Sequence, residues 1–209
     1  MKTLIAVPCM DSVPSQFAQS LSMLQKVGEC AVTFEIGSLI YTSRNNIGKK
    51  AIELGADYVF WLDSDMTFAP DILVKMMKTL QDNKLDMLSG LYFRRAHPFS
   101  PVLFKELTID EDAVCTWTEY KDIPKEGLFE VGGCGFGCVL MGTDVLMSVQ
   151  STFNNMFAPI GNVGEDLSFC FRARECGYKI YCDPEMTLGH VGHTIVTRQF
   201  FEAYREQSK

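Results

Sequence analysis

The sequence lacks the long hydrophobic run of a membrane helix, which needs about 20 apolar residues. Its first apolar stretch, residues 4–7, ends at Pro8 and is shorter than the apolar region of a usual signal peptide. We therefore interpret it as a buried strand and expect no membrane span. No internal repeat, low-complexity tract or interdomain linker is evident in the 209 residues, of which 47% are hydrophobic and 22% charged. Length and composition predict one globular domain with a substantial core.

The sequence also lacks closely spaced pairs of cysteines. The eight cysteines include no CxxC pair, which argues against a zinc knuckle. Because no secretion signal is found, we expect free thiols in a reducing compartment, and hence a cytoplasmic protein. Several of these cysteines lie in apolar stretches, where cysteine packs as a small hydrophobic residue.

Positive charge is scarce as well. The formal net charge is −7, whereas an extended nucleic-acid surface normally needs a basic face. Arg94, Arg95 and His97 form one short cationic stretch, which we interpret as a solvated loop. The charge balance therefore argues against a nucleic-acid-binding protein, and only this stretch keeps a nucleic-acid ligand under consideration.

The first half of the sequence alternates strand and helix patterns. Apolar runs predict strands at residues 4–7, 31–36 and 58–62, and amphipathic patterns predict helices from Pro14 to Gly28, from an N-cap at Ser43 to Gly55, and from Pro70 onward. This order predicts an α/β fold with a mostly parallel sheet covered by helices on both faces. Ligands of such sheets bind beyond the carboxyl ends of the strands, here after Val7 and Leu62.

The second half is less regular. Residues 98–131 have weak periodicity and predict loops or short hairpins. Beyond them the patterns predict a strand at 138–141, a short helix capped by Thr143, a helix over 165–176 ended by Gly177, a strand at 178–182 and a terminal helix over 197–206. The glycine cluster at 132–137 lacks the GxGxxG spacing of a dinucleotide site, and we interpret it as a place where backbone approaches a ligand closely.

Two carboxylates follow the most apolar strand, in the run VFWLDSD at residues 59–65. Asp63 and Asp65 can reach one site if the chain turns there. Mg²⁺ and Mn²⁺ prefer oxygen ligands, and Mg²⁺ often takes one or two carboxylates together with substrate phosphates. The pattern indicates a divalent-metal site that can hold a diphosphate and neutralise its charge on departure.

Two further motifs stand late in the sequence. Glu165 and Asp166 follow Gly164 at a predicted helix start, where acidic residues are favourable and where a carboxylate can also serve as a general base. His190 and His193 lie between glycines in GHVGH. Because imidazole suits Mn²⁺ better than Mg²⁺, either histidine is a candidate metal ligand.

Taken together, these motifs resemble a GT-A glycosyltransferase of the family 2-like group. The resemblance rests on the order and spacing of four stretches, IAVPCMD, SRNNIGKKAIELGADYVFWLDSDM, GGCGFGCVLMGTDVL and GEDLSFCFRARECGYKIYCDPEMTLGHVGH. It implies a single GT-A domain, with a nucleotide-sugar-binding half at residues 1–97 and an acceptor and catalytic half at residues 98–209.

The resemblance also implies roles for individual residues. Asp63 and Asp65 would form the metal-binding DxD motif around Ser64, with Asp65 as the more direct ligand of Mn²⁺ or Mg²⁺. His190 would be the third metal ligand, with His193 as its alternative. Asp166 would be the catalytic carboxylate on the acceptor side. At the donor end, Pro8 would lie against the nucleotide base and Arg44 would approach the nucleotide or its pyrophosphate.

The resemblance leaves donor and acceptor open. A UDP-sugar is the first choice for the donor and a GDP-sugar the second. The acceptor is a saccharide, a small molecule or a modified nucleic-acid base, and transfer with inversion is expected because the family resemblance implies it.

Two other classes of protein compete with this interpretation. Asp63, Asp65 and Thr67 also match the DxDx[TV] pattern of haloacid-dehalogenase-like phosphohydrolases, in which Asp63 would be the nucleophile and Asp65 the acid/base. In that family the motif usually lies in the first strand, whereas several elements precede it here. The third class is a non-catalytic nucleotide-sugar-binding module, which would need no catalytic carboxylate.

Overall fold

A seven-stranded sheet forms the centre of the molecule. The computed structural model describes residues 1–37, 39–110, 112–120, 122–192 and 195–207. In spatial order the strands are β2 (Glu29–Ile36), β1 (Lys2–Cys9), β3 (Tyr58–Leu62), β10 (Cys138–Gly142), β5 (Met87–Leu91), β11 (Ile180–Thr187) and β8 (Phe129–Val131). The predicted boundary at residue 97 runs through this sheet, because residues from both sides of it contribute strands.

The sheet is mixed, and five of its seven strands run in the same direction, as a mostly parallel sheet requires. β1 runs parallel to both β2 and β3, and β5 runs parallel to β11. β10 is antiparallel to its neighbours β3 and β5, and β8 is antiparallel to β11. The predicted α/β architecture with helices on both faces is confirmed, and β10 is the element that joins its two parallel parts.

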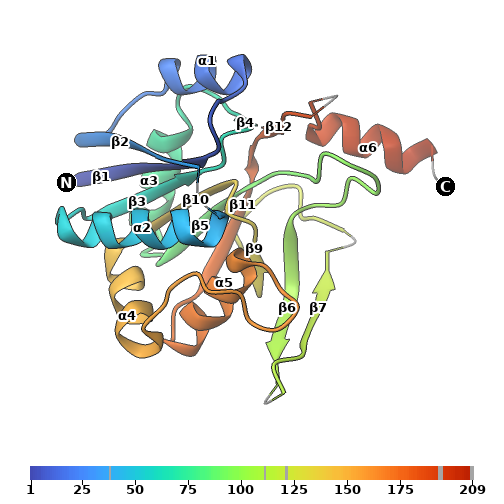
Figure 1. Cartoon of the computed structure of the whole chain (residues 1–209). Helices are drawn as coiled ribbons and strands as arrows, with labels where there is room; N and C mark the ends of the chain where they lie inside the picture. Colours follow the sequence, from blue (N-terminus) through green and yellow to red (C-terminus); the bar gives the residue numbers. More distant parts are fainter. Residues whose placement is uncertain (38, 111, 121, 193–194, 208–209) are drawn as a thin grey trace.

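Helices cover both faces of the sheet (Figure 1). One face carries α2 (Ile40–Glu53), α4 (Thr143–Phe153) and α5 (Glu165–Glu175), and the other carries α1 (Ser15–Met23) and α3 (Ile72–Asp82). The strands alternate between the two layers, as their period of two requires. In β3, for example, Trp61 belongs to the core beneath α2 and α5, whereas Phe60 belongs to the core beneath α3.

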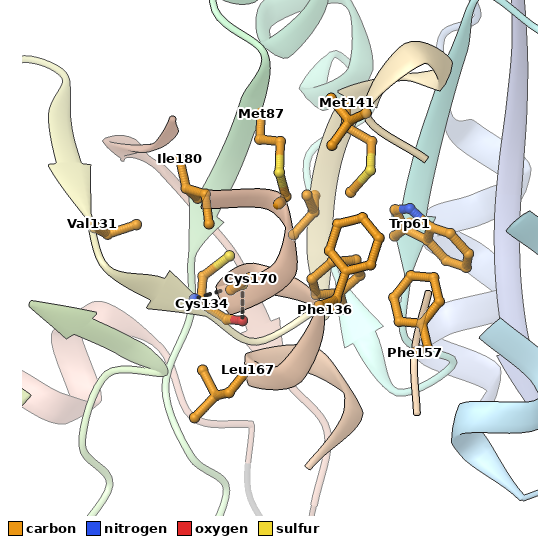
Figure 2. Packing of buried hydrophobic residues seen from close by; sticks show 14 of the residues in the cluster. Trp61, Met87, Val131, Cys134, Phe136, Met141, Phe157, Leu167, Cys170 and Ile180 are labelled. Atoms are coloured by element: carbon orange, nitrogen blue, oxygen red, sulfur yellow. Dashed lines mark hydrogen bonds between the residues drawn. The ribbon is translucent and has the colours of Figure 1, made fainter. Parts of the chain in front are cut away.

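Aromatic side chains fill the core beneath α5 (Figure 2). The ring of Trp61 lies 5.9 Å from that of Phe136 and 5.2 Å from that of Phe157, both in edge-to-face arrangements. Phe157 stacks on Phe169 of α5 at 4.5 Å. Such aromatic pairs stabilise by about 0.5–1.5 kcal/mol beyond their area burial. The cluster therefore fixes α5 against the end of β3, where the predicted carboxylates stand.

The remaining elements lie around the carboxyl ends of the central strands. They are the short pair β4 (Met66–Thr67) and β12 (Gly189–His190), the sheet of β6 (Leu103–Ile109), β7 (Cys115–Glu119) and β9 (Gly133–Cys134), and the C-terminal helix α6 (Arg198–Gln207). The β6–β7 hairpin confirms the prediction of short hairpins within residues 98–131. No helix in the described part of the chain has the length and apolar character to cross a membrane.

Several predicted helix boundaries need correction. α2 begins one turn before Ser43, which is buried inside the helix, so Ser43 is not an N-cap. α1 ends at Met23 rather than at Gly28, and Gly28 instead turns the chain into β2 with φ 67°. Thr143 is the first helical residue of α4, not its cap, because Gly142 takes the N-cap position. The predicted buried face of α3 is confirmed.

Candidate functional site

A cavity of about 410 Å³ opens beyond the carboxyl ends of β1 and β3. All the described site residues predicted from the sequence line it, namely Pro8, Arg44, Asp63, Ser64, Asp65, Asp166 and His190. His193 lies outside the described residues. The structure therefore brings together side chains that are separated by as much as 182 positions in the sequence, from Pro8 to His190. Their individual roles stay predictions.

A tight turn after β3 aims both carboxylates into this cavity. The amide of Asp63 donates to the carbonyl of Gly137 at 3.2 Å, and the amide of Met66 donates back to the carbonyl of Asp63 at 3.2 Å. The chain thus leaves the extended conformation at Asp63, and both Asp63 and Asp65 line the cavity. This is the local geometry that the DxD interpretation required.

Backbone hydrogen bonds place His190 beside Asp65. β12 pairs with β4, and the amide of Val191 donates to the carbonyl of Asp65 at 2.7 Å. As a result His190 Nε2 lies 3.4 Å from Asp65 Oδ2. The other ring nitrogen, Nδ1, lies 2.8 Å from the carbonyl oxygen of Phe93. A carbonyl only accepts, so Nδ1 carries a proton and Nε2 is the nitrogen that faces the carboxylate.

The same contacts perturb both groups. Burial acts to raise the pKa of Asp65, but the hydrogen bond and charge of His190, together with the charge of Arg95, hold it below its ordinary value. Burial acts to lower the pKa of His190, but its bonds to Asp65 and to the Phe93 carbonyl raise it above its ordinary value. Each group thus stabilises the charged form of the other.

Asp65 and His190 have the donor chemistry of a manganese site. With Nδ1 bonded to a backbone carbonyl, neutral His190 directs its Nε2 lone pair at a carboxylate oxygen, which is the orientation of a metal-ligating imidazole. Within the described residues no group of three or more His, Cys, Asp or Glu side chains converges for a metal. Diphosphate oxygens would have to complete the coordination, as they commonly do for Mg²⁺ in phosphate-binding sites. The residues therefore fit a divalent cation that is bound together with its substrate.

Asp63 reaches the same cavity with a different partner. Arg44 donates from Nη2 to Asp63 Oδ1 at 2.7 Å and from Nε to Glu165 Oε1 at 3.1 Å. The guanidinium is only 2% exposed and lies 5.7 Å and 5.2 Å from the ring centres of Trp61 and Phe136. Arg44 therefore ties the end of β3 to the start of α5. That Asp63 also ligates the metal stays a prediction.

Asp166 is the second residue of α5, which begins at Glu165 after the N-cap Gly164. Its Oδ1 accepts from the amide of Leu167 at 2.8 Å. Burial and the negative charges of Glu165 and Asp63 raise the pKa of Asp166 to about 6, against the lowering effects of the Leu167 amide and Arg44. The sequence predicted that the helix N-terminus would favour the ionised form. Burial outweighs that effect, and the pKa of Asp166 lies above its ordinary value.

Sequence reasoning assigned no site role to two residues of this region, and it placed one of them, Arg95, in a solvated loop. Arg95 lines the cavity, and its Nη1 donates both to Asp65 Oδ2 and, at 3.4 Å, to the carbonyl of Val191. Tyr92 is buried beneath the site and accepts from the amide of Gly137 at 3.1 Å. A Cβ on Gly137 would lie 2.7 Å from the Tyr92 ring, so this glycine accommodates protein rather than a ligand. The signal that could have found Arg95 is its place two residues after Phe93, at the end of an apolar, strand-like run.

Comparison with known proteins finds likeness in fold alone. No family model and no curated protein sequence matches the chain. The solved structure of A197 from STIV matches with a TM-score of 0.64 at 19% identity, covering 92% of this chain and 86% of that one. GalNAc-T7, solved with UDP, GalNAc and Mn²⁺, matches with a TM-score of 0.63 at 9% identity. That match covers 91% of this chain and 44% of the GalNAc-T7 chain. The chain therefore has a GT-A-like α/β fold.

Proposed function

We propose that the chain is a metal-dependent glycosyltransferase that moves a sugar from a nucleotide-diphosphate sugar to an acceptor hydroxyl, with inversion of configuration. One observation carries the proposal. A single cavity combines the Asp65–His190 pair, suited to a divalent cation, with a separate carboxylate, Asp166, whose pKa is about 6. The fold is shared with a protein solved with UDP, GalNAc and Mn²⁺.

The lining of the cavity at its donor end supports the proposal that it binds a nucleotide. Pro8, Cys9, Met10 and Ile40 form an apolar part of its wall, which suits the flat face of a base. A bound Mn²⁺ or Mg²⁺ would neutralise the diphosphate as it departs, and the imidazole ligand favours Mn²⁺. We propose a UDP-sugar as the donor and a GDP-sugar as the second choice. Ser64, between the two aspartates on the cavity wall, belongs to the donor-binding residues.

Asp166 is the proposed general base. An acceptor hydroxyl is a poor nucleophile near pH 7, and a positioned carboxylate that takes its proton contributes about 10²- to 10⁴-fold to the rate. Because its pKa is about 6, Asp166 is mostly ionised at pH 7 yet remains a stronger base than an ordinary carboxylate. Glu165 is less suited to this role, since its Oε1 accepts from Arg44.

Arg44 acts as a positioning residue in this scheme rather than as a ligand of the donor. Two of its donor groups are bonded to Asp63 and Glu165, and its Nη1 is buried with no hydrogen-bond partner among the described residues. An arginine that bridges two carboxylates in a buried site fixes the geometry of both. Arg44 thereby links Asp63, on the metal side of the cavity, to Glu165, which precedes Asp166 on the acceptor side.

We propose a saccharide acceptor ahead of a small molecule or a modified nucleic-acid base. The cationic stretch that kept a nucleic-acid ligand under consideration is engaged within the protein. Arg94 pairs with Glu119, Arg95 with Asp65, and His97 lies within hydrogen-bonding distance of Tyr204.

We retain a cytoplasmic location as a proposal, since the eight cysteines are free thiols.

Donor binding and donor hydrolysis test this function. Titration calorimetry with UDP and GDP should show nucleotide affinity that depends on Mn²⁺, and a donor panel should reveal slow hydrolysis of one nucleotide sugar. Equal UDP affinity in EDTA would contradict metal dependence. Phosphate release from a phosphomonoester would instead support the phosphohydrolase, which needs Asp63 as a free nucleophile although its Oδ1 accepts from Arg44. Binding without any turnover would support the non-catalytic module.

A further inference from the structure

Two adjacent arginines after β5 have different environments. Arg94 pairs with Glu119 on the β6–β7 hairpin, at 3.0 Å, and does not line the cavity. Arg95 lines the cavity and donates to Asp65 Oδ2, the oxygen that also faces His190 Nε2 at 3.4 Å. One carboxylate oxygen is thus approached by a guanidinium and an imidazole at once. These two groups surround the position from which a cation would bind Asp65.

The Arg95 side chain is held less firmly than that of Arg44. It is 54% exposed, whereas the other arginine of the cavity, Arg44, is 2% exposed and held by two carboxylates. Its second hydrogen bond, to the Val191 carbonyl, is long at 3.4 Å. Asp65 is 22% exposed, so the pair is open to solvent mainly on the Arg95 side, where solvent weakens an ion pair. The Arg95 guanidinium is therefore the less firmly held of the two arginines in the cavity.

We propose that in the free protein the Arg95 guanidinium occupies the position of the divalent cation at Asp65. When the cation binds, it displaces the guanidinium, which then binds the donor diphosphate. The inference rests on the proposed function. In the free protein Arg95 neutralises Asp65 and competes with the metal for Oδ2. When metal and diphosphate arrive together, the competition ends because the guanidinium gains phosphate oxygens, which it binds with good geometry. Arg95 thereby weakens the binding of metal alone and strengthens the binding of metal with nucleotide.

Mn²⁺ binding without nucleotide tests the first part of this mechanism. The free Mn²⁺ signal in electron paramagnetic resonance gives the affinity of the wild type, of Arg95→Gln and of the control Arg94→Gln, which removes the same charge one residue away. Arg95→Gln should bind Mn²⁺ alone roughly 2- to 5-fold more tightly, as expected for the loss of a weak competing ion pair. Arg94→Gln should match the wild type.

UDP binding in saturating Mn²⁺ tests the second part. Here Arg95→Gln should bind UDP more weakly than the wild type, so the variant changes the two affinities in opposite directions. A variant that merely perturbed the fold would weaken both, and equal thermal unfolding temperatures would verify that Arg95→Gln is folded.

Three results would overturn the proposal. Mn²⁺ affinity in Arg95→Gln that is equal to or weaker than that of the wild type would show that Arg95 does not compete with the metal. Equal tightening in both glutamine variants would show a general effect of charge. Unchanged UDP affinity would remove the diphosphate role. Each result leaves the proposed function intact if the wild type binds UDP with Mn²⁺, whereas a wild type that binds neither overturns both proposals.

Discussion

Replacing Asp166 with asparagine should make the protein more stable and far less active. The amide keeps the shape of the side chain and an oxygen that can accept from the Leu167 amide, as Oδ1 does at 2.8 Å. It removes the negative charge, which burial and neighbouring carboxylates disfavour. The same environment that prepares Asp166 to take a proton therefore reduces the free energy of unfolding.

The magnitude follows from the two pKa values. The pKa of Asp166 is raised from 3.8 to about 6 in the folded protein, and each pKa unit corresponds to about 1.4 kcal/mol. Between these values the folded state binds more protons than the unfolded state, so stability falls as pH rises toward 6 and remains reduced above it. Asp166→Asn should recover at most about 3 kcal/mol at pH 8, and the gain should disappear below about pH 4.

Urea unfolding at pH 8 and pH 4, without metal or nucleotide, measures this effect. Glu175→Gln is the matched control, because it exchanges an exposed carboxylate for an amide in the same helix and should change stability by less than about 0.5 kcal/mol. Transfer by Asp166→Asn should fall by at least about 10²-fold with donor and metal binding nearly unchanged. No gain in stability at pH 8, or wild-type transfer rates, would refute the reasoning.

Three further changes test other parts of the site. Arg44→Met should reduce the free energy of unfolding by about 3–5 kcal/mol in urea titrations, because it leaves two partly buried carboxylates unpaired; an effect below about 1 kcal/mol would contradict the bridging role. Phe201→Ala should weaken Mn²⁺–UDP binding in calorimetry, because Phe201 stacks at 4.6 Å on Phe93, whose carbonyl accepts from His190; unchanged affinity together with a lowered unfolding temperature would limit Phe201 to packing. Removal of divalent metal with EDTA should abolish donor hydrolysis, and restoration by Mn²⁺ should exceed that by Mg²⁺; equal turnover in EDTA would exclude a required metal.

The strands and the position of the cavity could be predicted because both depend on local pattern. Uninterrupted apolar runs identified β1 and β3, and the rule that ligands bind beyond strand ends directed attention to Pro8 and Asp63. The antiparallel direction of β10 could not be predicted in this way. A run of five residues, Cys138–Gly142, forms the same local pattern whichever way the strand runs.

The partners within the site depend on contacts between distant segments. Arg95 meets a carboxylate 30 positions earlier and a carbonyl 96 positions later, and no spacing rule relates them. The pKa of Asp166 is similar in this respect. Its helix position was visible in the sequence, but its burial depends on the elements packed around it.

The placement of β10 also determines the order in which the chain can assemble. β3 and β5 both come from the first 97 residues, yet they do not pair with each other, because β10 lies between them. A nascent chain that ends at residue 97 would therefore leave one edge of β3 and both edges of β5 unpaired, a state prone to aggregation. β3 and β5 are joined only once β10, which ends at Gly142, has been synthesised, and the sheet is complete only after β11, which ends at Thr187. Splitting the chain at residue 97 should consequently give fragments that fold only together.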